Sequence, residues 1–247
     1  MADDFFFDFE SGGHKAYVPY PRDTFEKGMR TCFDNGFISR GAVFLDLGAG
    51  KGRIVREAAH LGLRAYGIEY HAELVSASDL KIADAQRFGE IQKDRICRVV
   101  QGSYYPPDYI RLRAQGQAVA LHHEDRFFDG ITSDELSCFS FPRKTRARVF
   151  YPIASDHDPF VALGIAWHDV SVFFSYTWGV EFPSQLEIFS RYAAPGAVFL
   201  NETAAEPEKH EDLLEALGLQ QKSLGVSLYR YRSSVKTTSG LMLYRKK

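Results

Sequence analysis

Short apolar runs alternate along this 247-residue chain with segments whose apolar residues recur at helical spacing. Residues 42–47 form an almost wholly apolar run that ends at glycines, as expected of a central parallel strand covered on both faces. From Arg53 to Leu61 the apolar residues recur at helical spacing, and Gly62 follows where a helix end favours a left-handed residue. Residues 64–69 predict a second strand. The order is therefore strand, glycine loop, helix, strand.

The same alternation continues to the end of the chain. It predicts a helix over 72–91, a third strand over 95–100, a helix over 181–192, a fifth strand over 197–200, a helix over 207–217 and a closing β-hairpin over 224–231 and 240–244. Two apolar runs compete for the fourth strand, 127–133 and 169–175. We favour 169–175, because a helix and a fifth strand follow it in the expected order. This choice leaves about 106–168 as an insertion.

This order predicts an α/β fold with a Rossmann-like, doubly wound, seven-stranded and mostly parallel sheet that ends in the β-hairpin. We divide the chain into an N-terminal segment or cap over residues 1–40 and one domain over 41–247, which carries the insertion before its fourth strand. Ligands of such sheets bind beyond the carboxyl ends of the strands. We expect the insertion to form a lid or substrate wall, or to carry secondary structure of its own.

Composition narrows the classes of partner. The chain has 30 Lys and Arg against 32 Asp and Glu, a formal net charge of -2. This balance disfavours nucleic acid as a partner, although Arg143–Arg148 is a local basic cluster. Cys32, Cys97 and Cys138 are widely spaced, which predicts reduced thiols and no metal site. The sequence lacks both a run of about 18 apolar residues and the basic start of a secretory signal, so we expect no membrane span and a cytoplasmic protein.

The loop after the first strand, Asp46-Leu47-Gly48-Ala49-Gly50-Lys51-Gly52, has three glycines at alternating positions. Glycines remove side chains where the backbone turns sharply, so main-chain N–H groups can approach a ligand at the start of the helix. A phosphate-binding P-loop requires Ser or Thr after its lysine, and Gly52 stands there instead. The dinucleotide fingerprint requires a third glycine at position 53, which is Arg53, so an NAD site is weakened but stays an alternative.

These residues resemble the class I methyltransferases that use S-adenosylmethionine (SAM), whose first motif is Asp/Glu-x-Gly-x-Gly-x-Gly. Asp46 and the three glycines fill every specified position. Glu69 ends the second strand 17 residues after Gly52, where the family carries an acid that accepts hydrogen bonds from the ribose hydroxyls. The likeness covers about residues 17–105 and 165–247. It implies SAM as the cofactor, held by Asp46, Gly48, Ala49, Gly50, Gly52, Glu69, Tyr70, Ser103, Tyr104 and Ser175.

Two further strings refine this resemblance. Gln101-Gly102-Ser103-Tyr104-Tyr105 is similar to the next family motif, which contacts adenine, but Ser103 replaces the usual acid. The segment Tyr17-Val18-Pro19-Tyr20 and the string Gly-Lys-Gly-Arg-Ile-Val resemble methyltransferases that modify protein lysines. The acceptor class stays open among protein side chain, small molecule and nucleic acid, and the balanced charge disfavours the last.

Candidate acceptor-binding residues follow the fourth strand. Ser175-Tyr176-Thr177-Trp178 stands where related amino-methylating enzymes carry Asn/Asp/Ser-Pro-Pro-aromatic. The first and fourth positions fit, and both prolines are missing. The resemblance implies that Ser175, Tyr176 and Trp178 hold the acceptor near the sulfonium, with the aromatic ring favouring cationic character.

Transfer to a neutral hydroxyl or amine also needs a base. The candidates are Tyr20, His157 and His168, because phenol and imidazole groups can act as general bases. The expected function is transfer of a methyl group from SAM to an N or O acceptor. Two alternatives stay open, namely an NAD-dependent oxidoreductase and a catalytically silent SAM-fold protein that acts as an interaction module.

Overall fold

The computed structural model gives the arrangement of most of the chain. It describes residues 6–8, 15–17, 20–121, 157–176, 181–203, 211–232 and 235–246. Several sequence-based predictions lie outside these residues: the competing strand at 127–133, the basic run 143–148, Val18-Pro19, Trp178 and the start of the helix predicted over 207–217. Among the described residues, no helix has the length and apolar character needed to cross a membrane.

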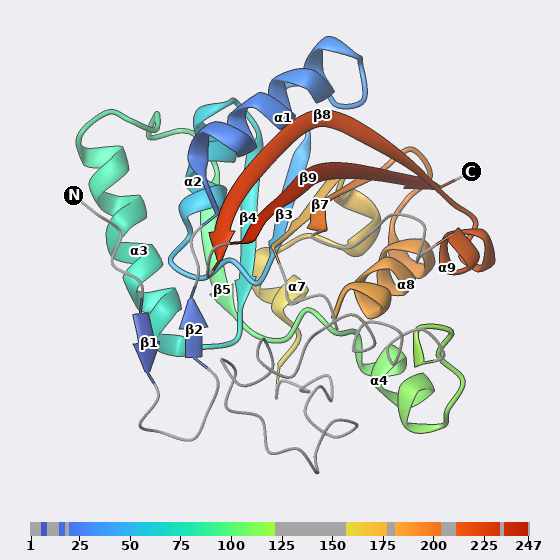
Figure 1. Ribbon diagram of the computed structural model, residues 1–247. Coiled ribbons are helices and arrows are strands. Elements are labelled where there is room, and N and C mark those ends of the chain that lie inside the picture. Colours follow the sequence, from blue (N-terminus) through green and yellow to red (C-terminus); the bar gives the residue numbers. More distant parts are fainter. Residues whose placement is uncertain are drawn as a thin grey trace.

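The described strands form a seven-stranded sheet with the order β5-β4-β3-β6-β7-β9-β8 (Figure 1). Their bounds are β3 (Val43–Leu47), β4 (Arg64–Glu69), β5 (Cys97–Gln101), β6 (Val172–Ser175), β7 (Val198–Thr203), β8 (Leu219–Arg232) and β9 (Val235–Lys246). Neighbours from β5 to β7 pair in parallel, whereas β9 is antiparallel to β7 and β8 is antiparallel to β9. The predicted fold class, a doubly wound and mostly parallel sheet with a closing hairpin, is confirmed. A separate antiparallel pair is formed by β1 (Phe6–Asp8) and β2 (Lys15–Tyr17).

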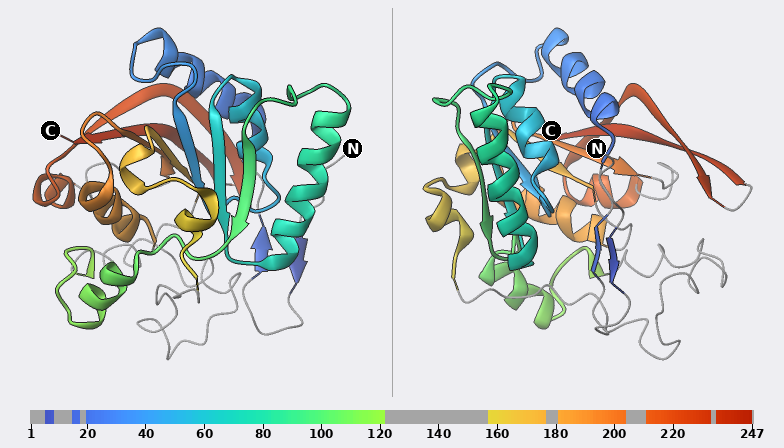
Figure 2. Two further views of the ribbon diagram at one scale, coloured as in Figure 1. Left: turned by 180° about the vertical axis from the view of Figure 1, so that it is seen from behind. Right: turned by 90° about the vertical axis from the view of Figure 1, so that its left-hand side faces the viewer.

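Helices cover both faces of the sheet, as the two turned views in Figure 2 show. They are α1 (Arg22–Asp34), α2 (Arg53–His60), α3 (Ala72–Arg87), α4 (Pro107–Ala114), α7 (Pro159–Leu163), α8 (Phe182–Tyr192) and α9 (Glu211–Ala216), with a 3-10 turn at Trp167–Asp169. Alternate strand residues enter two separate cores, because successive side chains of a strand point to opposite faces. Phe44 and Phe174 pack with residues of α1 and α2, and Leu45 and Phe173 pack with residues of α8.

The observed elements differ from the predicted ones in specific ways. The helix predicted over 72–91 ends at Arg87, and Gly89 follows with φ of 75°. The fourth strand begins at Val172 rather than 169, because Trp167–Asp169 forms the 3-10 turn. The helix α1 was not predicted; its Phe25 and Met29 are fully buried, so this part of residues 1–40 contributes to the core. The hairpin strands β8 and β9 are also longer than predicted.

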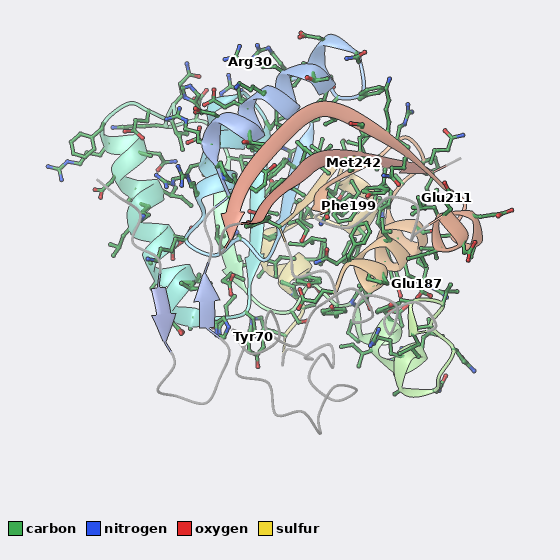
Figure 3. All side chains as sticks on the ribbon, viewed as in Figure 1. Arg30, Tyr70, Glu187, Phe199, Glu211 and Met242 are labelled. Carbon is green, nitrogen blue, oxygen red and sulfur yellow. The ribbon has the colours of Figure 1, made fainter. Side chains whose placement is uncertain are left out.

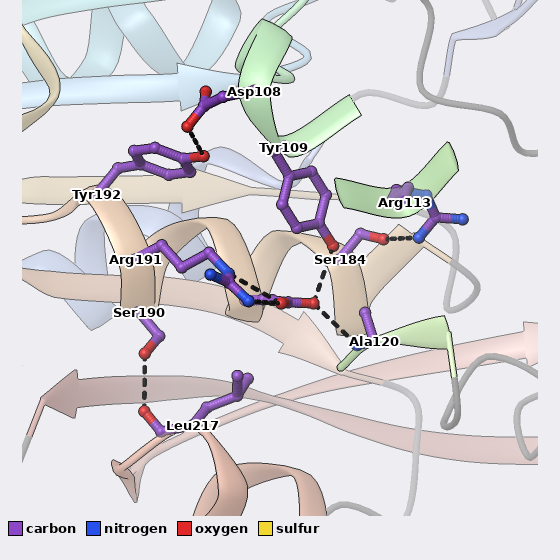
Figure 4. Close-up of polar contacts among 10 residues, drawn as sticks. Asp108, Tyr109, Arg113, Ala120, Ser184, Ser190, Arg191, Tyr192 and Leu217 are labelled. Atoms are coloured by element: carbon purple, nitrogen blue, oxygen red, sulfur yellow. Dashed lines mark hydrogen bonds and ion pairs between the residues drawn. The ribbon is translucent and has the colours of Figure 1, made fainter. Parts of the chain in front are cut away.

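A buried carboxylate holds the beginning of the predicted insertion against α8 (Figure 4). Glu187 of α8 has no exposed surface, and its Oε2 accepts hydrogen bonds from Tyr109 Oη at 3.2 Å and from the Ala120 N–H at 2.8 Å. Its Oε1 forms an ion pair with Arg191 at 2.7 Å. Asp108 adds a second link, because it accepts a hydrogen bond from Tyr192 at 2.6 Å. Residues 107–121 are therefore fixed to the body of the domain.

Exchange of Glu187 for Gln is expected to lower the free energy of unfolding by about 1–2 kcal/mol. Gln has one acceptor oxygen where Glu has two, so either Arg191 or the pair Tyr109 and Ala120 loses its partner. Urea denaturation followed by circular dichroism measures the change. Exchange of the exposed Glu215 for Gln is the matched control, expected to stay within about 0.5 kcal/mol of the native chain. Equal stability of both variants would contradict the role of Glu187.

Candidate functional site

The glycine loop leaves β3 and turns at once into α2. Gly48, Gly50 and Gly52 all have positive φ, at 93°, 53° and 68°. Residues with a Cβ are disfavoured in this conformation, which explains the choice of glycine at these positions. The backbone N–H groups of Gly48 and Ala49 both donate to the Ile68 carbonyl, at 3.0 and 2.9 Å, and so fasten the loop to β4. A Cβ built on Gly48 would meet nothing within 4 Å, so space opens beside the loop.

Glu69, at the carboxyl end of β4, is bonded directly to this loop. Its Oε2 accepts a hydrogen bond from the Gly50 N–H at 2.8 Å, and its Oε1 accepts one from the His71 N–H at 2.9 Å. The residue is 7 % exposed. Each carboxylate oxygen has two lone pairs, so both oxygens can accept a further hydrogen bond. The structure thus brings the predicted ribose-binding acid and the glycine loop together.

Asp46 adds a second carboxylate at the carboxyl end of β3. It is 3 % exposed and lies in the strand register next to Gly67 of β4 and Phe174 of β6. Burial raises the pKa of Asp46 well above its usual range, and the nearby charge of Glu69 raises it further. A ligand that carries positive charge at this edge would lower the pKa of Asp46, because positive charge favours the ionised form of the carboxyl group.

Glu181, immediately before α8, is an acid that the sequence predictions missed. Its Oε2 accepts a hydrogen bond from Tyr104 Oη at 3.3 Å, and Tyr104 Oη in turn accepts one from Gln185 Nε2 at 3.0 Å. Burial raises the pKa of Glu181 to about 7, the Tyr104 hydrogen bond opposes this shift, and the charge of Glu69 adds to it. Glu181 therefore stands within electrostatic reach of Glu69 and titrates near neutral pH.

Tyr104 connects the end of β5 to α8. Its ring stacks on Tyr105 with centroids 4.6 Å apart, and its hydroxyl lies between Glu181 and Gln185. Burial raises the pKa of Tyr104 well above its usual range, so the hydroxyl stays protonated and donates to Glu181. Ser103, in the same predicted motif, is buried, and its Oγ accepts the Tyr105 N–H at 3.2 Å. Its hydroxyl therefore stabilises the local turn, and its contact with a cofactor stays a prediction.

The predicted acceptor-binding residues at the end of β6 have structural contacts. Ser175 is fully buried; its Oγ donates to the Leu47 carbonyl at 3.2 Å, and its own carbonyl accepts Asn201 Nδ2 at 3.0 Å. Tyr176 packs edge-on against Tyr20 with ring centroids 5.0 Å apart. These contacts fix the carboxyl ends of β3, β6 and β7 to one another. A role for Ser175, Tyr176 or Tyr20 in binding an acceptor stays a prediction.

The remaining predicted residues lie at opposite edges of the sheet, two at the carboxyl ends of the parallel strands and one at the amino ends. Tyr70 follows Glu69, is 43 % exposed, and lies near the lower end of the sheet in Figure 3, whereas Arg30 lies near the top. His157 Nε2 lies 3.0 Å from the carbonyl of Gln101, the last residue of β5, and so is at the carboxyl edge as well. His168 precedes β6 and is exposed at the amino edge, so the structure does not bring it together with the glycine loop. Within the described residues, no three His, Cys, Asp or Glu side chains are grouped to hold a metal ion.

Glu181 belongs to no motif recognised in the sequence. It follows the predicted motif at 175–178 and stands at the start of a predicted helix, where it resembles an ordinary surface acid. Its position six residues after Ser175, the last residue of β6, was the available clue, because ligands of such sheets bind beyond the carboxyl ends of the strands. Burial and the charge of Glu69 raise the pKa values of Asp46 and Glu181, so a positively charged ligand at this edge would favour the ionised forms of these two acids.

Comparisons with known proteins find no matching family model and no matching curated protein. Solved structures do match. A precorrin-6y C5,15-methyltransferase from Geobacter metallireducens is 12% identical, with a TM-score of 0.45 over 92% of this chain and 86% of that chain. An RNA methyltransferase from Salinibacter ruber, in complex with S-adenosyl-L-homocysteine, is 16% identical, with a TM-score of 0.44 over 93% and 92%.

A magnesium protoporphyrin IX methyltransferase from Synechocystis with bound SAM is 9% identical, with a TM-score of 0.48 over 92% of this chain and 79% of that chain. These scores and identities are low, and the fold assignment rests on the strand order and register described above. That order, with β9 antiparallel to both β7 and β8, gives the chain a Rossmann-like, mostly parallel sheet that ends in a hairpin.

Proposed function

We propose that this protein binds SAM at the carboxyl edge of β3 and β4 and transfers its methyl group to an N or O acceptor. The observation that carries the proposal is the direct hydrogen bond from the Gly50 N–H to Glu69, which joins the three-glycine loop to a buried acid with free acceptor capacity. The similar solved structures are of methyltransferases named for different substrates, so they do not identify an acceptor for this chain.

The residues of this edge fit the chemical groups of SAM. Glu69 can accept the two ribose hydroxyls, because each of its oxygens already holds one N–H donor and retains a lone pair. The open space beside Gly48 lets a ligand approach the backbone closely. The sulfonium and ammonium groups of this cofactor would favour the ionised forms of Asp46 and Glu181, whose pKa values are raised by burial and by the charge of Glu69.

When bound, SAM supplies a methyl group on a positively charged sulfur, which leaves as a neutral thioether and needs no proton. The protein therefore has two tasks, to hold the acceptor in line at near-attack distance and to take the proton that the acceptor loses. Glu181 is our candidate for the second task, since its carboxylate lies at the carboxyl edge and Tyr104 holds it in place. Tyr104 and Gln185 act as positioning residues for Glu181.

Calorimetric titration with SAM and with NADH, followed by incubation with methyl-labelled SAM and fractionated cell extract, tests the proposal. We expect micromolar affinity for SAM, no binding of NADH, and label in one class of macromolecule or metabolite. Extract incubated with heat-denatured protein is the control. Binding of NADH instead of SAM would favour an oxidoreductase, and SAM binding without any labelled product would favour an interaction module.

A further inference from the structure

A cavity lies where α1, α2 and α3 come together on one face of the sheet. These three helices stand side by side in Figure 1 and in Figure 2. The cavity is lined by Arg56, Glu57 and His60 of α2, by Arg22 of α1, and by residues of α3 and of the turn that follows it. The glycine loop precedes the first turn of α2, whereas the cavity lies against the middle and the end of this helix. The cavity is therefore distinct from the candidate site.

Arg56 contributes a buried donor to this cavity. Its Nε is buried and makes no hydrogen bond with the residues that the structure describes. A donor that has left water needs an acceptor, because the hydrogen bonds that it made to water are otherwise lost. An arginine also keeps its positive charge at any ordinary pH. The cavity thus presents a permanent cation with an unused donor.

Glu57 contributes a buried acceptor to the same cavity. Its Oε2 is buried and accepts no hydrogen bond from any residue within the described ranges. Arg22 Nε lies 2.9 Å from this oxygen, but its single N–H is directed at Glu26 Oε1, which is 2.8 Å away. Burial raises the pKa of Glu57, and the charges of Arg22 and Arg56 oppose this shift. Arg56 and Glu57 therefore lie within electrostatic reach of each other.

The remaining lining residues close the cavity and fix its shape. His60 Nδ1 lies 3.0 Å from the Glu90 carbonyl, which can only accept, so the ring donates this hydrogen bond and joins the end of α2 to the turn after α3. The N–H groups of Glu90 and Ile91 donate to the Ala85 carbonyl at 2.9 and 3.2 Å. Ala85 and Ile91 are buried and give the cavity an apolar wall beside its charged groups.

We infer that this cavity binds a small carboxylate that carries a hydroxyl or amino group on the adjacent carbon. The ligand carboxylate accepts from Arg56, because a guanidinium presents its N–H groups in a fork that matches a carboxylate. The hydroxyl or amino group donates to Glu57, since an ionised carboxylate only accepts. The cavity has a volume of about 210 Å³, below that of pockets for drug-sized ligands, so a molecule of the size of lactate or alanine suits it.

The mixed charge of the lining favours this ligand class over a simple anion. Two arginines and two glutamates line the cavity. An inorganic phosphate that reached Arg56 would also approach Glu57, and like charges repel each other. A donor group on the ligand replaces this repulsion with a hydrogen bond to a charged acceptor. The inference does not rest on the proposed function, because neither Glu69 nor the glycine loop lines the cavity.

Calorimetric titration of the full chain with L-lactate, L-alanine, propionate and inorganic phosphate tests the inference. Propionate has the same carboxylate and carbon skeleton as the first two probes but lacks the donor group. We expect L-lactate or L-alanine to bind at least about tenfold more tightly than propionate or phosphate, because a hydrogen bond to a charged group contributes about this factor. Comparison of the first two probes distinguishes a hydroxyl donor from an amino donor.

Three variants connect this binding to the cavity. R56Q is expected to bind the preferred probe at least about tenfold more weakly, because the carboxylate of the probe loses its partner. E57A is expected to bind this probe and propionate with nearly equal affinity, a result that a general loss of structure would not produce. R111Q, at an exposed position of α4, is the matched control and should bind as the native chain does. The thermal unfolding midpoint without ligand shows whether each variant is folded.

Three results would overturn the inference: neither L-lactate nor L-alanine binds, propionate binds as tightly as both, or R56Q and R111Q weaken binding equally. A native chain that binds one of these probes but not SAM leaves the inference intact and removes the proposed function. The two failures are therefore distinguishable.

Discussion

The rate of methyl transfer is expected to rise about tenfold between pH 6 and pH 8, and exchange of Glu181 for Gln is expected to lower it by about 100-fold and to remove this rise. Burial raises the pKa of Glu181 to about 7. A carboxyl group must be ionised to act as a base. The fraction of molecules with an ionised Glu181 therefore grows as the pH rises through this value and approaches one at higher pH. The measurement is kcat/KM for SAM in the labelled transfer assay, since this constant reports the protein without bound cofactor.

Two controls separate a chemical role of Glu181 from a structural one. The exposed Glu215 exchanged for Gln should keep both the rate and its pH dependence. Exchange of Tyr104 for Phe removes the hydroxyl that donates to Glu181, so the pH dependence should move toward higher pH without disappearing. An unchanged pH profile in the Glu181 variant would show that another group takes the proton.

Exchange of Glu69 for Gln is expected to weaken SAM binding by about 100-fold. A carboxylate that accepts hydroxyl hydrogen bonds contributes about 1.5–3 kcal/mol for each, and the neutral amide loses most of this. Gln keeps one acceptor oxygen for the Gly50 N–H, so the loop has a means to stay in place. Isothermal titration calorimetry gives the affinity, and the thermal unfolding midpoint without ligand shows whether the variant is folded.

A SAM analogue that lacks one ribose hydroxyl tests the contact itself. The native chain should bind this analogue more weakly than SAM. The affinities of the Glu69 variant for the two ligands should differ much less, because the variant has no carboxylate to accept a hydrogen bond from the hydroxyl that the analogue lacks. If the Glu69 variant binds SAM as the native chain does, the assignment of this acid to the ribose is wrong. Exchange of the exposed Glu90 for Gln serves as the matched control.

The strands β3 and β4 were predictable from the sequence because nearly all of their residues are buried on both faces of the sheet. β4 matches the predicted residues 64–69, and β3 differs by one residue from the predicted 42–47. Such strands leave a continuous apolar run between turn residues, which is a local signal. The α1 helix gives a weaker signal, since its buried positions include Thr24 and Gly28 beside Phe25 and Met29. Gly28 is there because Leu241 of β9 packs against its backbone, a contact between residues far apart in sequence.

The candidate site was predictable to the extent that it lies in one local motif. The glycine loop and Glu69 form a single unit of strand, loop, helix and strand, and the structure joins them by a hydrogen bond. Glu181 was missed because its environment comes from Tyr104 and Glu69, which are more than 70 residues away in sequence.

The glycine loop is fastened by a hydrogen bond from the Gly50 N–H to Glu69, an acid of the same chain, and this bears on the kinetics of cofactor capture. A loop whose donor is already fixed does not have to search for its bound conformation, so almost every folded molecule is competent to bind. Association should then follow a single exponential whose rate grows linearly with SAM concentration, without the plateau that a slow rearrangement imposes. Differences in affinity among ligands would arise in the dissociation rate.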